Sequence, residues 1–103
     1  YVDNPQAKGR LTHFPPNWSP RYLRPRVVDA TRRYMQVAKN HGMTATQLAL
    51  AWCYTRWFIA STIIGATSIE QLAYDIDAYS IQLSDEVVKA VNEIHAEFMN
   101  PGQ

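Results

Sequence analysis

Residues 60–76 read ASTIIGATSIEQLAYDI, and this stretch decides the fold class that the sequence predicts. The β-branched run at 62–64 favours a strand over 61–64 that is buried on both faces, as in a parallel sheet covered by helices. Gly65 permits a tight exit from that strand. A helix is expected from about residue 68 to 78, because capping residues follow the glycine at once. A strand that leads directly into a helix is typical of an α/β fold.

The start of this expected helix is a candidate anion site. Thr67 and Ser68 can each cap it, with Glu70 and Gln71 respectively in the third helical position. The N–H groups and the positive dipole end of a helix N-terminus attract anions such as phosphate. The alternative is that both residues are ordinary caps of a turn. The chain contains neither G-x-G-x-x-G nor G-K-[ST], so the Rossmann and P-loop types of phosphate site do not apply.

Three further helices are predicted around this stretch. The first begins at Pro25, where proline is favoured, and ends before Gly42. The second is opened by a capping box of Thr44 and Gln47 and is apolar on nearly all sides, so it should be buried on several of them. The last is capped by Ser84. Its inner face is formed by four apolar residues at helical spacing: Val87, Val91, Ile94 and Phe98.

The chain divides into a proline-rich loop over 1–25 and a folded part over 26–103. The loop holds five of the six prolines and shows no sustained hydrophobic period. Charge is also unevenly distributed. Residues 1–39 carry eight basic and two acidic residues, a balance of +6, whereas residues 40–103 carry two basic and seven acidic residues, a balance of −5. A basic arm favours an anionic partner, a nucleotide phosphate or nucleic acid, unless the two halves attract each other.

Length and composition are those of one globular domain or part of one. No apolar run approaches 18 residues, so no membrane partner is expected. The only cysteine, Cys53, cannot form an internal disulfide, which favours a cytoplasmic setting. The chain begins with Tyr1 in loop-like sequence rather than with methionine, which suggests a piece of a longer protein.

Three segments together resemble the C-terminal end of aldo-keto reductases, the NADP(H)-dependent (β/α)8-barrel enzymes. They read TATQLALAW (44–52), STIIGAT (61–67) and SIEQLAYDIDAYSIQLSDE (68–86). The resemblance covers about residues 26–98 and is closest to the branch of the potassium-channel β-subunits and related bacterial reductases. It implies the C-terminal portion of a TIM barrel, by itself mostly helical with one short strand near 61–64. Tyr1 would then follow the seventh barrel strand, and the loop over 1–25 would lie near the cofactor and substrate.

The resemblance also implies a cofactor site at the start of the helix that follows STIIGAT. Thr67 matches the Ser/Thr that contacts the adenosine 2′-phosphate, and Gln71 matches a glutamine that lies along the adenosine end. Asp75 stands where the family usually has an asparagine against the adenine. A carboxylate can accept a hydrogen bond from the adenine amino group but cannot donate to a ring nitrogen.

The remaining expected cofactor-binding residues are the neighbours Gly65, Ala66 and Ser68. Some relatives carry a basic residue beside the phosphate, and here Ala66 and Ser68 stand there instead. NADP(H) is therefore the expected cofactor and NAD(H) is left open. Arg10 or another arginine of the loop can supply the missing charge.

No residue matches the catalytic Asp, Tyr, Lys and His of the family, which lie on the early strands of its barrel. His13, His41 and His95 occupy positions typical of surface or packing histidines. The chain is expected to be a fragment of an oxidoreductase that reduces aldehydes and ketones by hydride transfer, and to be inactive in isolation. Its expected partners are the nicotinamide dinucleotide and either the rest of the barrel or another copy of the chain. Phe14 and Trp18 suggest only an apolar or aromatic wall for an undefined substrate.

Two other classes of function remain open. The stretch VAKNHGMTATQLALAW (37–52) fits the outline of a helix-turn-helix, but its second helix offers only Thr46 and Gln47 before an apolar run. A recognition helix needs polar side chains that reach base edges, so no nucleic-acid partner is expected. The other class is a helical self-association module. A strand at 61–64 without neighbours should pair with another chain or abandon strand geometry. The residues expected to associate are Leu50, Trp52, Ile63 and Ile64.

Overall fold

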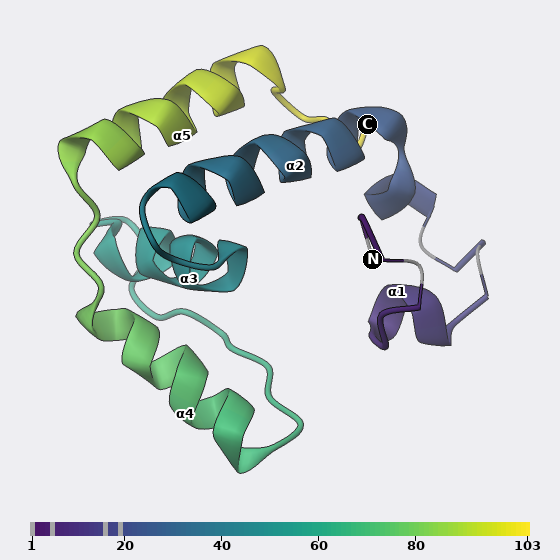
Figure 1. Cartoon of the computed structure of the whole chain (residues 1–103), viewed down its shortest axis with the longest axis horizontal. Helices are drawn as coiled ribbons and strands as arrows, with labels where there is room; N and C mark the ends of the chain where they lie inside the picture. The colour runs from purple at the N-terminus through teal and green to yellow at the C-terminus, as the bar shows by residue number, and fades with distance from the viewer. Residues whose placement is uncertain (1, 5, 16, 19) are drawn as a thin grey trace.

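The computed structural model describes residues 2–4, 6–15, 17–18 and 20–103, and these are arranged almost entirely as helices and connections (Figure 1). The elements are, in chain order, α1 (Arg10–His13), η1 (Pro20–Leu23), α2 (Pro25–Asn40), α3 (Ala45–Thr55), α4 (Ile69–Asp77), η2 (Ala78–Ser80) and α5 (Asp85–Glu97), where η marks a 3-10 helix. The prediction of a mostly helical chain is confirmed. The expectation for Tyr1 falls outside the described residues.

The strand predicted over residues 61–64 is wrong. These residues form a drawn-out connection between α3 and α4 without regular secondary structure (Figure 1). A strand is stable only when its N–H and C=O groups pair with a neighbour, and the described ranges contain no other strand. At Gly65, φ is not positive and a Cβ would meet nothing within 4 Å, so neither the backbone nor the neighbouring atoms require glycine there.

The loop predicted over residues 1–25 is only partly irregular, because α1 and η1 form one short turn each within it. Thr12 accounts for α1. Its hydroxyl donates to the carbonyl of Ala7 at 2.7 Å and accepts from the N–H of Gly9 at 3.0 Å. Local hydrogen bonds of this kind stabilise turns that a hydrophobic period does not reveal.

The predicted helix ends are confirmed. Gly42 follows α2 with φ of 72°, and its N–H donates to the carbonyl of Lys39 while that of Met43 donates to Ala38. This pattern satisfies the last carbonyls of a helix and favours glycine. At the start of α3, the N–H of Gln47 donates to the Thr44 hydroxyl at 3.1 Å and the Gln47 side chain accepts from the N–H of Thr44 at 2.9 Å.

The core lies where α2, α3 and α5 meet (Figure 1). Its buried centre consists of Ala38, Leu48, Val87 and Val91, and five partly buried residues pack around it: Tyr34, Val37, Met43, Trp52 and Leu83. Within α3, Leu48 and Ala51 are buried, whereas Ala49 is exposed. The sequence predicts that α3 is buried on several sides, and the exposure of Ala49 shows that this prediction is wrong for that side of the helix.

The helix α4 is joined to α3 by two hydrogen bonds. The Tyr54 hydroxyl donates to the carbonyl of Asp75 at 3.0 Å. The Tyr74 hydroxyl lies 2.5 Å from the hydroxyl of Thr44. These contacts hold the C-terminal half of α4 against α3.

An ion pair and a hydrogen bond connect the basic and acidic halves of the chain. Arg33 pairs with Glu97 at 3.0 Å, and the Arg24 guanidinium donates to the carbonyl of Gly102 at 3.0 Å. The ion pair supports internal attraction between the two halves for Arg33. Each exposed pair contributes little free energy, about 0–1 kcal/mol.

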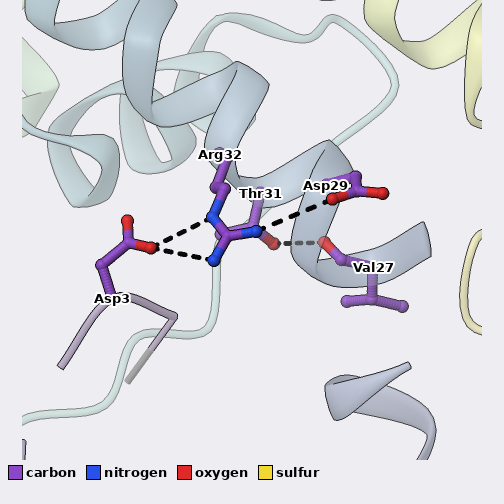
Figure 2. A network of polar contacts seen from close by, with 5 residues as sticks. All are labelled: Asp3, Val27, Asp29, Thr31 and Arg32. Atoms are coloured by element: carbon purple, nitrogen blue, oxygen red, sulfur yellow. Dashed lines mark hydrogen bonds and ion pairs between the residues drawn. The ribbon is translucent and has the colours of Figure 1, made fainter. Parts of the chain in front are cut away.

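A second polar network ties the N-terminal segment to α2 (Figure 2). Arg32 pairs with Asp3 at 3.0 Å and with Asp29 at 3.8 Å. Beside it, the hydroxyl of Thr31 donates to the carbonyl of Val27 at 2.7 Å. Asp3 thus docks residues 2–4 on α2, which holds this segment beside the helical body.

Among the described residues, no helix is long and apolar enough to cross a membrane.

Candidate functional site

The N-terminus of α4 brings Thr67, Ser68 and Gln71 together. Ser68 is the N-cap, and its hydroxyl accepts from the N–H of Gln71 at 3.1 Å. The Gln71 side chain turns back past the cap, and its Oε1 accepts from both the N–H and the hydroxyl of Thr67, at 2.9 and 3.0 Å. Of the two caps that the sequence allowed, the structure therefore uses Ser68. The two donors of Thr67 converge on a single acceptor oxygen.

A hollow of about 660 Å³ lies in front of Thr67 and is lined on its other side by the segment that contains α1. Its lining residues are Lys8, Gly9, Arg10, Thr12, His13, Phe14 and Thr67. Two cationic side chains thus line the same hollow as the exposed donors of Thr67. Arg10 was named from the sequence as one source of positive charge, whereas Lys8 and His13 were not assigned to the site. No sequence pattern relates residue 8 to residue 67, since only tertiary packing brings them together.

Asp75 lies one turn beyond Gln71 on the same side of α4, because positions four apart are neighbours on a helix. It is 8% exposed, while Gln71 is exposed. No ion pair to the Asp75 carboxylate is present among the residues described. Gly65 and Ala66 are exposed in the connection before the cap. The structure thus groups Thr67, Ser68 and Gln71 around shared hydrogen bonds and leaves Asp75 in a more buried setting.

Phe14 lines this hollow, and its ring contacts two further aromatic residues of the N-terminal segment. The rings of Phe14 and Trp18 lie 4.5 Å apart between centroids, and His13 contacts Phe14 edge to face at 5.2 Å. The pairing of Phe14 and Trp18 agrees with an apolar or aromatic wall in the N-terminal segment. The other two histidines lie elsewhere, His41 at the C-terminus of α2 and His95 on α5.

A second hollow, of about 640 Å³, lies between α2, α3 and α5. Its lining is mainly apolar and includes Leu48, Trp52, Phe58 and Val91. Leu48 of α3 also belongs to the buried core that α3 shares with α2 and α5. No group of three or more described His, Cys, Asp or Glu residues is arranged to hold a metal ion.

The sequence model of the aldo/keto reductase family matches residues 2–96. Protein tas of Escherichia coli K12 is 32% identical over 79% of the chain and 23% of its own length. An aldo-keto reductase of Babesia bovis is 33% identical over 98% of the chain and 36% of its own length. A putative voltage-gated potassium channel subunit beta of Schizosaccharomyces pombe is 33% identical over 65% of the chain and 20% of its own length.

The chain thus spans between a fifth and about a third of the length of these relatives. The matched segment of the family model includes the hollow in front of Thr67, the start of α4 and the whole helical core. On this match the chain belongs to the aldo/keto reductase family.

Proposed function

We propose that this chain forms part of an NADP(H)-dependent oxidoreductase that reduces aldehydes and ketones, and that it holds the adenosine-phosphate end of the cofactor. Membership of the aldo/keto reductase family supports the reaction class and a (β/α)8 barrel for the whole enzyme. The observation that carries the cofactor assignment is the hollow shared by Thr67, Lys8 and Arg10.

The start of α4 fits an anionic group. The N–H and hydroxyl of Thr67 are aimed at one oxygen atom, the Oε1 of Gln71. A phosphate oxygen is an acceptor of the same kind and carries more charge, so it can take the place of the amide oxygen. The positive dipole end of α4 favours that exchange. Gln71 would then be released to lie along the adenosine.

Charge supplied by the N-terminal segment favours a phosphate on the ribose. Lys8 and Arg10 line the hollow with Thr67, and cations beside a phosphate strengthen its hydrogen bonds. NAD(H) carries a hydroxyl in place of the 2′-phosphate and would leave these cations without a partner. We therefore assign NADP(H) rather than NAD(H) to this site.

Asp75 belongs to the proposed adenine end. The residue is 8% exposed and follows Gln71 by one turn of α4. An amino group such as that of adenine would donate to it. The backbone of Gly65, Ala66 and Ser68 would border the adenosine.

When bound, the nicotinamide supplies the hydride that reduces the carbonyl group. The residues of this chain act by binding and orientation. Thr67, Lys8 and Arg10 hold the phosphate, and Phe14 and Trp18 form an aromatic wall near the substrate. We place residues 1–25 as the loop near cofactor and substrate and residues 26–103 as the final part of the barrel. We also propose the rest of such a barrel as a partner, and a cytoplasmic location, because the only cysteine, Cys53, is free.

The test is a comparison of two ligands on the 103-residue chain. Adenosine 2′,5′-bisphosphate carries the phosphate in question, and adenosine 5′-phosphate lacks it. We expect the bisphosphate to bind at least about tenfold more tightly, as one charge-assisted hydrogen bond would give, and to shift the amide resonance of Thr67. Equal affinities would contradict the assignment to NADP(H), and an unperturbed Thr67 amide would contradict the site.

A matched pair of variants separates a specific contact from general positive charge. Arg10→Ala removes a cation that lines the hollow, whereas Arg21→Ala removes one that contacts Tyr22 instead. We expect the first to abolish the preference for the bisphosphate and the second to preserve it. Equal loss in both variants would mean that only the overall charge of the basic half matters.

A further inference from the structure

His13 is a third basic residue in the hollow in front of Thr67. It ends α1 and is exposed, and it lines that hollow together with Lys8 and Arg10. Lysine and arginine stay charged at every pH near neutrality, whereas histidine gains or loses its charge between about pH 5 and about pH 8. The positive charge in front of Thr67 therefore depends on pH through His13.

Hydrogen bonds within α1 hold His13 beside the other two basic residues. The N–H of His13 donates to the carbonyl of Gly9 at 2.9 Å. The Thr12 hydroxyl ties the same turn together, since it accepts from the N–H of Gly9 and donates to the carbonyl of Ala7. The His13 ring lies edge to face against Phe14, with 78° between the ring planes. One short turn of the chain thus presents all three basic side chains to a single hollow.

The surroundings of His13 are positive on one side and neutral on the other. Lys8 and Arg10 belong to its own segment, and Thr67, which lines the opposite side, is uncharged. Glu70 lies in the first turn of α4 and does not line the hollow. Within the described part of the chain, no carboxylate lines this hollow or forms an ion pair with His13. The counter-charge for a protonated His13 therefore has to come from a bound anion.

We propose that protonated His13 is a ligand of the 2′-phosphate, so that the preference for NADP(H) over NAD(H) weakens as the pH rises through neutrality. This inference rests on the proposed cofactor site. An imidazolium ring carries a charge and donates from both nitrogens, whereas the neutral ring has one donor and no charge. A charge-assisted hydrogen bond to phosphate is about twice as strong as a neutral one. Phosphate binding therefore favours the protonated ring and takes up a proton, and the affinity falls as His13 loses that proton.

The phosphate contributes the opposite trend at lower pH. A phosphate monoester gains its second negative charge near pH 6, so acid makes it a weaker acceptor. Lys8 and Arg10 keep their charges over the whole range and contribute a constant attraction. The preference for the 2′-phosphate should therefore be greatest between about pH 6 and about pH 7, where the phosphate is mostly doubly charged and much of the histidine is protonated.

The test measures the ratio of two affinities on the 103-residue chain, at about pH 6.5 and at about pH 8. Adenosine 2′,5′-bisphosphate and adenosine 5′-phosphate differ only in the 2′-phosphate, so the ratio isolates its contribution. We expect the ratio to fall at least about threefold between the two pH values, as a protonated ring that binds about tenfold more tightly than a neutral one would give. If the bisphosphate shows no preference at either pH, the proposed cofactor site fails and this inference fails with it.

Three variants locate the effect. His13→Gln removes the titrating ring, so the ratio should no longer fall between the two pH values. His13→Arg carries a fixed charge and should keep the ratio as high at the upper pH as at the lower one. His95→Gln makes the first change at an exposed histidine of α5, outside the hollow, and should retain the fall. Circular dichroism should show the same helix content in all four chains, because both histidines are exposed. An equal fall in His13→Gln and the unchanged chain would overturn the role of His13 and leave the proposed cofactor site intact.

Nuclear magnetic resonance provides a measurement that needs no variant. At about pH 7 the ring resonances of His13 should move toward their protonated positions when the bisphosphate is added, and should move much less with adenosine 5′-phosphate. The rings of His41 and His95 lie outside the hollow and serve as internal references. Resonances of His13 that respond equally to both ligands, or to neither, would overturn the proposal.

Discussion

One oxygen of Gln71 holds both hydrogen-bond donors of Thr67: the backbone N–H lies 2.9 Å and the hydroxyl 3.0 Å from Oε1. The cap of α4 is supplied separately by Ser68. Thr67 is therefore not needed to start the helix, and its donors are available to a ligand once the amide oxygen moves away. This separation makes the binding role of Thr67 testable without loss of the fold.

In an intact parent enzyme, Thr67→Ala should weaken the binding of NADPH more than the binding of NADH. The substitution removes a hydroxyl proposed to donate to the 2′-phosphate, and a charge-assisted hydrogen bond contributes about 1.5–3 kcal/mol. Titration of both cofactors measures the difference. Thr46→Ala, at an exposed position of α3, is the control and should leave both affinities unchanged. If Thr67→Ala weakened the binding of both cofactors equally, Thr67 would have a structural role and would not contact the 2′-phosphate.

Asp75→Asn should tighten the binding of NADPH and NADH by about the same factor. An amide can donate to a ring nitrogen of adenine as well as accept from its amino group. Cofactor titration measures the effect. The control is Asp77→Asn at the exposed C-terminal end of α4. Unchanged affinity for both cofactors would show that Asp75 does not contact the adenine.

The 103-residue chain alone should not reduce aldehydes with NADPH. None of its histidines or tyrosines stands at a position that matches the acid and base residues of the family, so proton transfer to the carbonyl oxygen has no donor. The measurement is the consumption of NADPH with a reactive aromatic aldehyde, on a sample whose mass is confirmed. Turnover above that of a boiled sample would contradict the expectation.

Thr44→Ala should destabilise the chain by about 1 kcal/mol, because it removes the side-chain half of a capping box. The hydroxyl of Thr44 also contacts that of Tyr74. A double-mutant cycle with Tyr74→Phe separates the two contributions, and Thr46→Ala serves as control within the same helix. If Thr44→Ala and Thr46→Ala lowered the free energy of unfolding equally, helix propensity rather than capping would explain the loss.

Stability should fall in alkaline solution through Tyr34. Burial raises the pKa of its hydroxyl, whereas in the unfolded chain a tyrosine ionises near pH 10. The unfolded state thus loses its proton first, so this stability is complete below about pH 10 and is lost as the pH rises through the raised pKa. Tyr34→Phe should flatten the decline in free energy of unfolding between pH 8 and about pH 11, and the exposed Tyr22 gives the control Tyr22→Phe. An identical decline in both variants would contradict the role of Tyr34.

Sequence alone determined the four longer helices, α2 to α5, and their ends, because these depend on neighbours within about one turn. The capping box of Thr44 and Gln47, the glycine end of α2 at Gly42 and the cap at Ser84 were all predicted, and all are present. The family was also determined by sequence, through TATQLALAW and STIIGAT. These features need no distant partner, since each hydrogen bond closes within a few residues.

Tertiary structure decided the features that depend on distant partners. The β-branched run around Ile63 predicts a strand, but a strand exists only with a neighbour, and none is present among the described residues. The site gained Lys8 and Arg10 only because the N-terminal segment folds back to Thr67. Local capping chemistry is encoded residue by residue, whereas strand pairing and the meeting of charges depend on which segments lie close in space.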